Sequence, residues 1–213
     1  WAFAVVIFGL LIGSLADGVT DFLTSPNAQE FIQKLGGASA LTDAFLAAQI
    51  AIMGILVSVY GVSAANHLRS EETSGHAEVI LATAATRTKW ATSHYVAALL
   101  GVAVLLLLTG LSVGVGAGFA LHDSSQVARV TVAALAQIPA AWVVTSVVLL
   151  IFGWMPRLTY AAWGFLVAFV ALGEFGVLWN APQWLMALSP FEHSPQLPVG
   201  MDAVAPVVWL ALV

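Results

Sequence analysis

One polar stretch, from His67 to Trp90, gathers most of the residue types that could do chemistry in this chain of 213 residues. It contains two histidines and six of the seventeen charged side chains, namely Arg69, Glu71, Glu72, Glu78, Arg87 and Lys89. Imidazole and carboxylate groups bind metals, so His67, Glu71, Glu72, His76 and Glu78 are a conceivable ligand set. Because such combinations often arise by chance in charged loops, we expect no metal site.

A docking surface is the second chemistry that these residues offer. Glu71, Gly75 and Glu78 recur at i, i+4 and i+7, which places them on one face if the stretch is helical. A short helix of this kind could present two carboxylates to a groove on a soluble partner. Thr86 is suited to cap the helix that follows. The alternative is a solvated loop whose charges only fix the topology of the chain.

Motifs for catalysis or nucleotide binding are absent from the sequence. Lys34 follows Gln33 and Lys89 precedes Trp90, so neither lysine lies in a phosphate-binding loop of the G-x-x-x-x-G-K-[ST] type. The sequence also has no HExxH and no GxSxG motif. We therefore expect that the chain is not an enzyme and binds no cofactor. With a net charge of −5 and no basic patch, nucleic acid is not an expected partner either.

The elements that hold the polar stretch are strongly apolar. The chain is 61% hydrophobic and only 8% charged, whereas soluble domains carry about 25% charged residues. Its apolar runs are continuous rather than alternating, which favours membrane-spanning helices over a barrel. At roughly 20 residues per span, the sequence predicts an all-α integral membrane protein with six transmembrane helices.

The six apolar segments are expected at about 1–16, 43–66, 92–119, 127–152, 158–178 and from near 203 onward. A kink is expected at Pro139, and five prolines between 179 and 206 exclude one straight helix there. Both ends of the sequence lie inside apolar runs, so we expect a part of a longer chain. Ser25 and Pro26 suit the start of a short amphipathic helix that lies on the membrane surface after the first span.

Within the spans, a few residues stand out from the apolar background. Gly110, Gly114 and Gly118 recur every four residues, a pattern that permits close helix packing. Glu174 is an acid inside an apolar segment, where it either lines a cavity or lies near the external interface. A candidate substrate path comprises Gln49, Met53 and Glu174, although Gln49 could instead form a hydrogen bond between helices.

The distribution of basic residues predicts the orientation. Arg69, Arg87, Lys89 and Arg157 fall on one side of the membrane, and Lys34 and Arg129 fall on the other. Positively charged residues favour the cytoplasmic side, so residues 67–90 and both ends of this sequence are expected to be cytoplasmic.

The stretch RSEETSGHAEVILATAATRTKW resembles the first cytoplasmic loop of ABC-2-type permeases, especially the tetronasin-type antibiotic and multidrug exporters of actinobacteria. The shared features are Arg69, the acidic pair Glu71 and Glu72, Gly75, Glu78, a small-residue turn at 81–83 and Arg87. Two further segments, GSLADGV after the first span and LSPFEHSPQLP before the last, support the resemblance, which extends over the whole chain.

The resemblance implies that residues 1–213 are the second, C-terminal half of a permease with twelve spans and the topology of ABC-2 (type V) exporters. Residues 67–90 would be the coupling loop, whose helix docks on a separate ABC ATPase present in two copies. Arg69, Glu71, Glu72, Gly75, Glu78 and Arg87 would form this ATPase-coupling interface. The partner ATPase would bind ATP and Mg²⁺, and the homologous N-terminal half would lie on the same chain.

The expected function is therefore the export of hydrophobic antibiotics, drugs or lipid-like molecules across the bacterial cytoplasmic membrane. Two alternatives stay open. A secondary transporter would work without ATP and would require helices broken at the midplane, and a structural membrane subunit would have no transport path.

Overall fold

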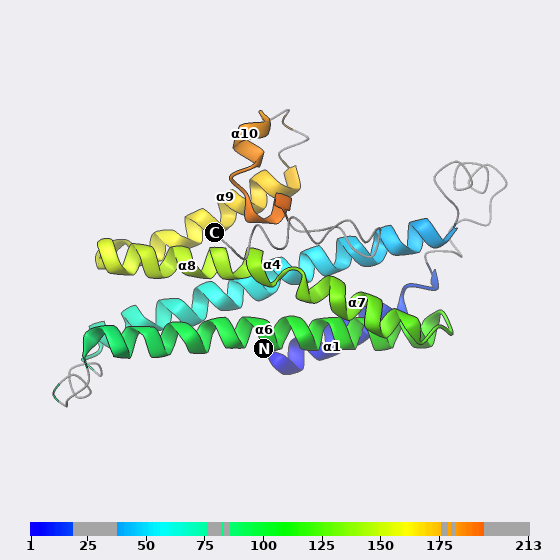
Figure 1. Ribbon diagram of the computed structural model, residues 1–213, viewed down its shortest axis with the longest axis horizontal. Helices are drawn as coiled ribbons and strands as arrows, with labels where there is room; N and C mark the ends of the chain where they lie inside the picture. The colour runs from blue at the N-terminus through cyan, green and yellow to red at the C-terminus, as the bar shows by residue number, and fades with distance from the viewer. Residues whose placement is uncertain (19–37, 76–81, 83–85, 176–178, 180–181, 194–213) are drawn as a thin grey trace. The chain divides into compact units, whose positions relative to one another are not determined.

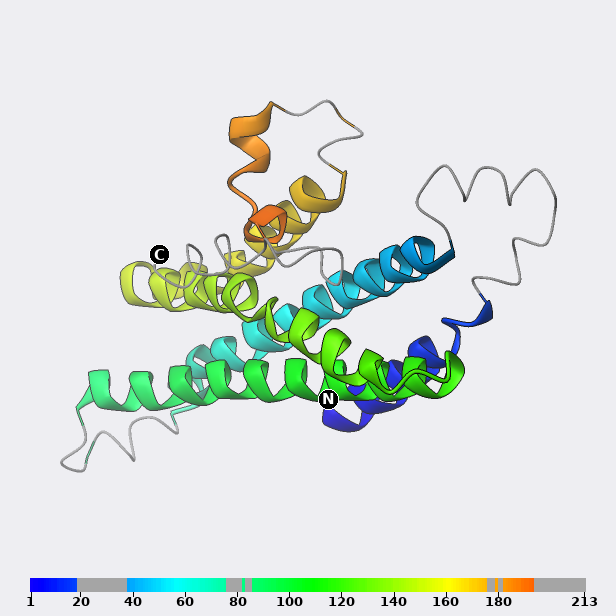
Figure 2. The same cartoon turned by 45° about the vertical axis from the view of Figure 1, so that its right-hand side comes forward.

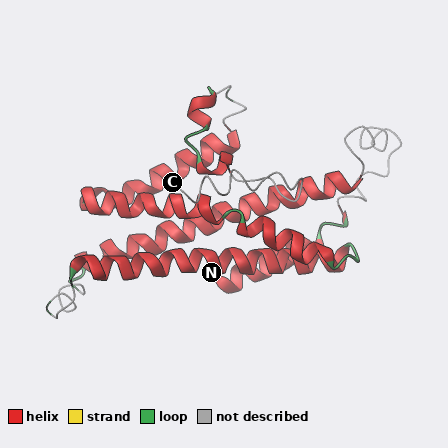
Figure 3. Ribbon diagram, viewed as in Figure 1, coloured by secondary structure: helices red, strands yellow, loops and turns green. Residues whose placement is uncertain are grey.

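The computed structural model describes residues 1–18, 38–75, 82, 86–175, 179 and 182–193, and every regular element among them is a helix (Figures 1 and 3). In chain order these are α1 (Ala2–Ser14), α4 (Ala38–Thr73), α6 (Arg87–Ala120), α7 (Ser125–Leu135), α8 (Ile138–Trp154), the 3-10 helix η1 (Pro156–Ala161), α9 (Ala162–Phe175), α10 (Gln183–Met186) and the 3-10 helix η2 (Pro190–His193). Helices satisfy their own backbone hydrogen bonds, as a lipid environment requires. The expected surface helix at 25–37 and the sixth apolar segment lie outside the described residues.

Four helical stretches are long and apolar enough to cross a bilayer, and they correspond to the second to fifth expected spans. They are Leu41–Thr73, Arg87–Ala120, Ser125–Trp154 and Pro156–Gly173. α1 is apolar but only 13 residues long. The described residues therefore contain four candidate spans rather than the six expected for the whole sequence.

Both ends of the polar stretch 67–90 are helical, and the apolar segment expected to end near residue 66 continues as a helix beyond it. α4 continues to Thr73, and α6 begins at Arg87. Charged residues leave the hydrocarbon without ending a helix, because leucine, arginine and glutamate are good helix formers in water. Thr86 does cap α6 as expected, since its hydroxyl accepts a hydrogen bond from the Lys89 N–H at 3.3 Å.

Gly75 lies two residues beyond the end of α4. It has a positive φ of 79°, and its N–H donates a hydrogen bond to the Glu72 carbonyl at 3.4 Å. A glycine in this conformation is a common helix terminator. The prediction that Glu71 and Gly75 share the face of one continuing helix is therefore wrong, and Glu78 lies outside the described residues.

The kink expected at Pro139 takes the form of a break between α7 and α8. α7 ends at Leu135, and the Gln137 N–H donates to the Ala134 carbonyl at 3.1 Å, a tighter turn than an α-helix makes. Proline has no N–H with which to continue the α-helical bonding pattern. The segment expected as one kinked span is thus built from two helices.

The described helices form two compact groups. The first takes its residues from Trp1–Gly54 and Leu105–Ile138, and the second takes its residues from Ile55–Val104 and Pro139–His193. Two long helices, α4 and α6, contribute residues to both groups.

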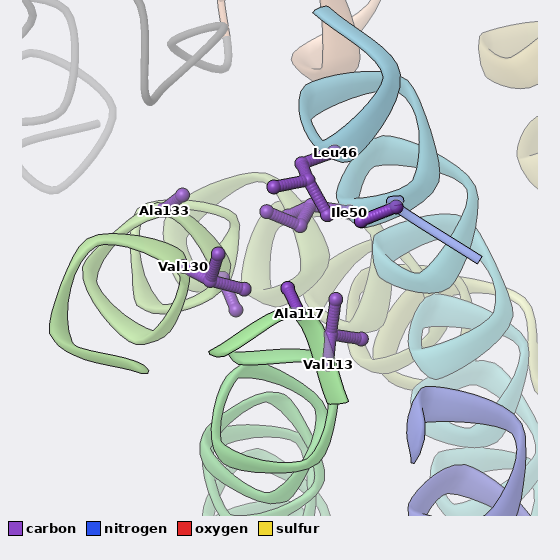
Figure 4. Packing of buried hydrophobic residues seen from close by; sticks show 8 residues of the cluster. Leu46, Ile50, Val113, Ala117, Val130 and Ala133 are labelled. Atoms are coloured by element: carbon purple, nitrogen blue, oxygen red, sulfur yellow. The ribbon is translucent and has the colours of Figure 1, made fainter. Parts of the chain in front are cut away.

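In the first group, α4, α6 and α7 enclose an aliphatic core. Leu46 and Ile50 of α4 point toward Val113 of α6 and Val130 of α7 (Figure 4). All four side chains are at most 1% exposed. α6 and α7 are joined by a short turn and run side by side in both views (Figures 1 and 2). In this turn His122 has a positive φ of 51°.

Glycines permit the helices of this group to approach closely. A Cβ atom built onto Gly110 would lie 2.6 Å from the Thr131 Cα, and one on Gly114 would lie 2.8 Å from the Val127 Cα. The glycine face expected from the sequence is therefore turned toward α7. α1 packs on another part of α6, where a Cβ on Gly116 would lie 2.6 Å from the Leu10 carbonyl oxygen.

In the second group, α4, α8 and α9 share a core that includes Val62, Val148 and Leu166. α6 is joined to α8 by a hydrogen bond of 3.1 Å from Trp142 Nε1 to the Leu99 carbonyl. The described part of the proline-rich stretch contains α10 and η2, so it is not one straight helix, as expected. The Ser189 hydroxyl ties it to α9 through a hydrogen bond of 2.8 Å to the Phe169 carbonyl.

Candidate functional site

The charged residues predicted as a coupling interface lie where α4 ends and α6 begins. Arg69, Glu71 and Glu72 are in the last two turns of α4, and Arg87 is the first residue of α6. All of them belong to the second helix group. The structure therefore brings together most of the charges that the sequence singled out.

Glu72 links the two helix ends. Its Oε2 accepts a hydrogen bond of 2.9 Å from Arg69 Nη1, and its Oε1 accepts one from Arg87 Nη2. The side chain of Glu72 is only 24% exposed, and that of Arg69 only 23%. Both carboxylate oxygens of Glu72 therefore contact arginines of the same chain. The ion pair with Arg87 joins two residues that are fifteen positions apart in the sequence.

Glu71 has a different environment from that of Glu72. Its Oε1 lies 3.6 Å from Nε2 of His67, one helical turn earlier on α4. Neighbouring residues of a helix point about 100° apart, so Glu71 does not join the bridge between the two arginines. Glu71 is therefore the acid of this pair whose carboxylate is not committed to α6.

Beside the Glu72 bridge lies an open pocket with a volume of about 670 Å³. Its lining combines the two bridged arginines with the turn between α8 and α9, and consists of Arg69, Glu72, Arg87, Met155, Pro156, Arg157 and Leu158. The lining thus contains three arginines and one glutamate. Within the described part of the chain, Arg157 forms no ion pair.

An apolar cluster lies next to Arg87 of the pocket. Leu68, Trp90 and Phe152 form a buried cluster of α4, α6 and α8. The guanidinium of Arg87 lies 5.8 Å from the centroid of the Phe152 ring, within the range of a cation–π interaction. Trp90 is only 5% exposed, whereas Trp154 is 88% exposed.

The sequence did not identify Phe152, Met155, Arg157 and Leu158 as part of this site. In the sequence, Arg157 indicates only the orientation of the chain. A signal for its position was nonetheless present, because the ends of successive spans alternate between the two membrane surfaces. The turn after α8 must therefore lie on the same surface as the turn after α4.

The candidate substrate-path residues lie in different helix groups. Met53 is buried at 1% exposure on α4, and Gln49 is half-buried one turn earlier. Both belong to the first group. The backbone of Glu174 lies in α9 of the second group, and its side chain is outside the described part of the structure.

No set of three or more histidine, aspartate or glutamate side chains is placed to hold a metal ion in the part of the chain that the structure describes. His67, Glu71 and Glu72 are near one another in sequence, but Glu72 is occupied by arginines. His76 and Glu78, the other members of the conceivable ligand set, lie outside the described residues.

Comparison with known proteins identifies the family. The family model described as the C-terminal domain of the multidrug efflux system permease Rv1217c matches residues 1–213. The multidrug efflux system permease protein Rv1217c of Mycobacterium tuberculosis is 37% identical over 212 residues. The match covers 99% of this chain but only 39% of that relative. The chain therefore belongs to the multidrug efflux permease family of Rv1217c and corresponds to its C-terminal domain.

Proposed function

We propose that this chain is the C-terminal membrane half of an ATP-driven exporter that moves hydrophobic drugs, antibiotics or lipid-like molecules out of the cell. The observation that carries the proposal is the family membership, since the relative is named a multidrug efflux permease and is covered over only 39% of its length. The remaining length of such a permease has room for a homologous N-terminal half. ATP and Mg²⁺ would be bound by two copies of a separate ATPase.

The ATPase would dock on the segment between α4 and α6. Because Glu72 ties the two helix ends together, a push on this segment would move α4 and α6 as one unit. α4 has 36 residues, which at 1.5 Å per residue is about 50 Å of continuous helix.

The proposal divides the predicted interface residues into two roles. Arg69, Glu72 and Arg87 would act as an internal clamp, because their charges are satisfied by one another. Glu71 and Glu78 would contact the ATPase, with Gly75 terminating α4 between them. The surface that bears this segment would be cytoplasmic, as the positively charged Arg69, Arg87, Lys89 and Arg157 favour, and the membrane would be the bacterial cytoplasmic membrane.

The docking role is tested by the double substitution Glu71→Lys with Glu78→Lys in the full permease. We expect normal membrane insertion but loss of substrate-stimulated ATPase activity, because two attractive charges become repulsive ones. Ser70→Lys is the matched control, since it adds a positive charge to the same exposed end of α4 without removing an acid. Stimulation equal to wild type in the double variant would count decisively against the docking surface.

ATP coupling itself is tested separately. Transport should be sensitive to vanadate and should stop when the catalytic glutamate of the co-purifying ATPase is replaced. Export that persists in that ATPase variant would favour a secondary transporter, and the absence of any export activity would favour a structural subunit.

A further inference from the structure

The pocket beside Glu72 has an excess of positive charge. Among its described lining residues, Arg69 and Arg87 share the one carboxylate of Glu72. Arg157 has no ion-pair partner within the described residues. Guanidinium groups bind phosphate through paired N–H donors, so an arginine-rich pocket of this kind is suited to a phosphate group.

The pocket also lies at a membrane surface. Its residues come from the end of the first candidate span, the start of the second, and the connection from the third to the fourth. Because consecutive spans cross a bilayer in opposite directions, these four span ends meet at one surface. All of them belong to the second helix group.

Exposed apolar side chains adjoin the arginines on the α8–η1 side. Met155 and Leu158 line the pocket and are 52% and 54% exposed. Leu150 and Trp154, one turn apart on α8, are 72% and 88% exposed. This arrangement offers cations to a polar headgroup and an apolar helix face to hydrocarbon chains.

We propose that the pocket binds the phosphate headgroup of an anionic phospholipid, with its acyl chains lying along Leu150 and Trp154 of α8. A free phosphate ion would leave the apolar part of the lining exposed to water. A phospholipid offers a phosphate to the arginines and acyl chains to the apolar side chains. Basic pockets between transmembrane helices are suited to anionic headgroups. The inference does not depend on ATP coupling, because it concerns only the end of the helix bundle.

The bound lipid would stabilise the arrangement of α4, α6 and α8 at this surface. Its phosphate would supply the counter-charge that Glu72 alone does not provide. The stability of the permease should therefore rise with anionic lipid rather than with zwitterionic lipid of the same chain length, since a ligand that binds only the folded state stabilises it.

The test uses the purified full-length permease, with phosphatidylglycerol and phosphatidylcholine of identical acyl chains as probes. We expect phosphatidylglycerol to raise the melting temperature of the wild type and to be retained in native mass spectra. Arg157→Gln should weaken the apparent affinity by about tenfold. Lys89→Gln, which removes an exposed charge at the same surface but outside the pocket, should leave it unchanged.

Several outcomes would overturn the proposal. If Lys89→Gln lost as much affinity for phosphatidylglycerol as Arg157→Gln, the lipid would be held by non-specific attraction to a charged surface. If inorganic phosphate or glycerol phosphate raised the melting temperature as much as phosphatidylglycerol does, the pocket would be a site for a free anion. An unchanged lipid response in Arg157→Gln, together with loss of a co-purifying protein, would assign the pocket to a protein contact.

If Arg157→Gln does not fold, Arg157→Lys keeps the charge but loses the paired donors. This variant should then show a smaller loss of lipid affinity than Arg69→Gln. Wild-type affinity in Arg157→Lys, together with wild-type affinity in Arg69→Gln, would likewise overturn the proposal.

Discussion

Glu72 holds the ends of two helices together with a single carboxylate. Its two oxygens contact Arg69 and Arg87, which lie on α4 and α6. No ion-pair partner of Glu71 is found on α6 within the described residues. Two adjacent glutamates therefore make different contacts: Glu72 pairs with arginines of α4 and α6, and Glu71 lies 3.6 Å from His67.

Replacing Glu72 with glutamine should destabilise the permease by removing both ion pairs. Because the pairs are partly exposed, each is worth at most about 1 kcal/mol, and two guanidiniums would be left close together. We expect a melting temperature a few degrees lower than that of the wild type, measured by fluorescence in detergent. Glu71→Gln is the matched control and should have a smaller effect. Equal shifts in both variants would show that the bridge does not stabilise the helix ends.

Asp123 is the second charged residue with a clear local role, at the start of α7. Its carboxylate accepts hydrogen bonds from the Ser125 hydroxyl at 2.8 Å, the Ser125 N–H at 3.0 Å and the Gln126 side-chain amide at 2.9 Å. These bonds, chiefly the one from the Ser125 hydroxyl, lower the pKa of Asp123 below its ordinary value, and the charge of Arg129 adds to the effect.

The lowered pKa gives a pH dependence with a defined sign. A carboxyl group with a lower pKa in the folded state stabilises the fold above its unfolded pKa of about 3.9. That contribution is lost as the pH falls through the folded pKa. Asp123→Asn should therefore lower the melting temperature at pH 7, and the difference from wild type should narrow only below about pH 4. The side chain of Ser124 forms no capping hydrogen bond. The control Ser124→Ala should therefore leave the melting temperature unchanged at pH 7 and below about pH 4.

At the scale of helices, small residues decide how closely α6 approaches its neighbours. Gly110 and Gly114 face backbone atoms of α7, and Gly116 faces the backbone of α1. The sequence pattern indicated close packing for Gly110, Gly114 and Gly118 but not which helix they would contact. Gly9 and Gly13 of α1, which face α6 in the structure, have the same four-residue spacing, so the sequence of α1 also contains a signal for close packing.

Adding one methyl group at Gly114 should disrupt the α6–α7 pair. The new Cβ would lie 2.8 Å from the Val127 Cα, and overpacking of this kind costs about 1–3 kcal/mol. Gly153→Ala on α8 is the control, because nothing lies within 4 Å of its Cβ position, and there alanine should stabilise the helix by about 0.5–1 kcal/mol. Thermal unfolding measures the change in stability of the two variants. A Gly114→Ala variant as stable as Gly153→Ala would contradict the close approach.

At the scale of the whole molecule, the family membership makes drug export the central expectation. Four apolar helical stretches are long enough to cross a membrane. Glu174 lies in α9, the last of the candidate spans in the described chain. An acid in this position would attract cationic substrates if it lines the transport path.

Glu174→Gln in the full permease should change the pattern of drug resistance more than the amount of assembled protein. Removing the negative charge should lower resistance to cationic compounds while resistance to neutral compounds persists. The measurement is a resistance profile against both classes, normalised to the permease in the membrane. An unchanged profile would favour a position at the external interface, away from the substrate path.

The sequence alone determined the features that depend on neighbouring residues. The length of the apolar runs predicted membrane helices, Thr86 predicted the start of α6, and Pro139 predicted a kink where α7 and α8 meet. Each of these follows from hydrophobicity or from backbone bonding within a few residues. The same local reasoning predicted the end of α4 too early, near residue 66 instead of Thr73. It assumed that the helix ends where the apolar residues end.

Only the tertiary structure decided how the charges pair. Glu72 contacts Arg87 across fifteen residues, and Arg157 joins the same pocket from a turn about seventy residues further along the chain. The sequence contains these charges but not their distances, which depend on how α4, α6 and α8 pack at Leu68, Trp90 and Phe152. The physical reason is that an ion pair is selected by proximity in space, and proximity is set by the buried apolar contacts between helices.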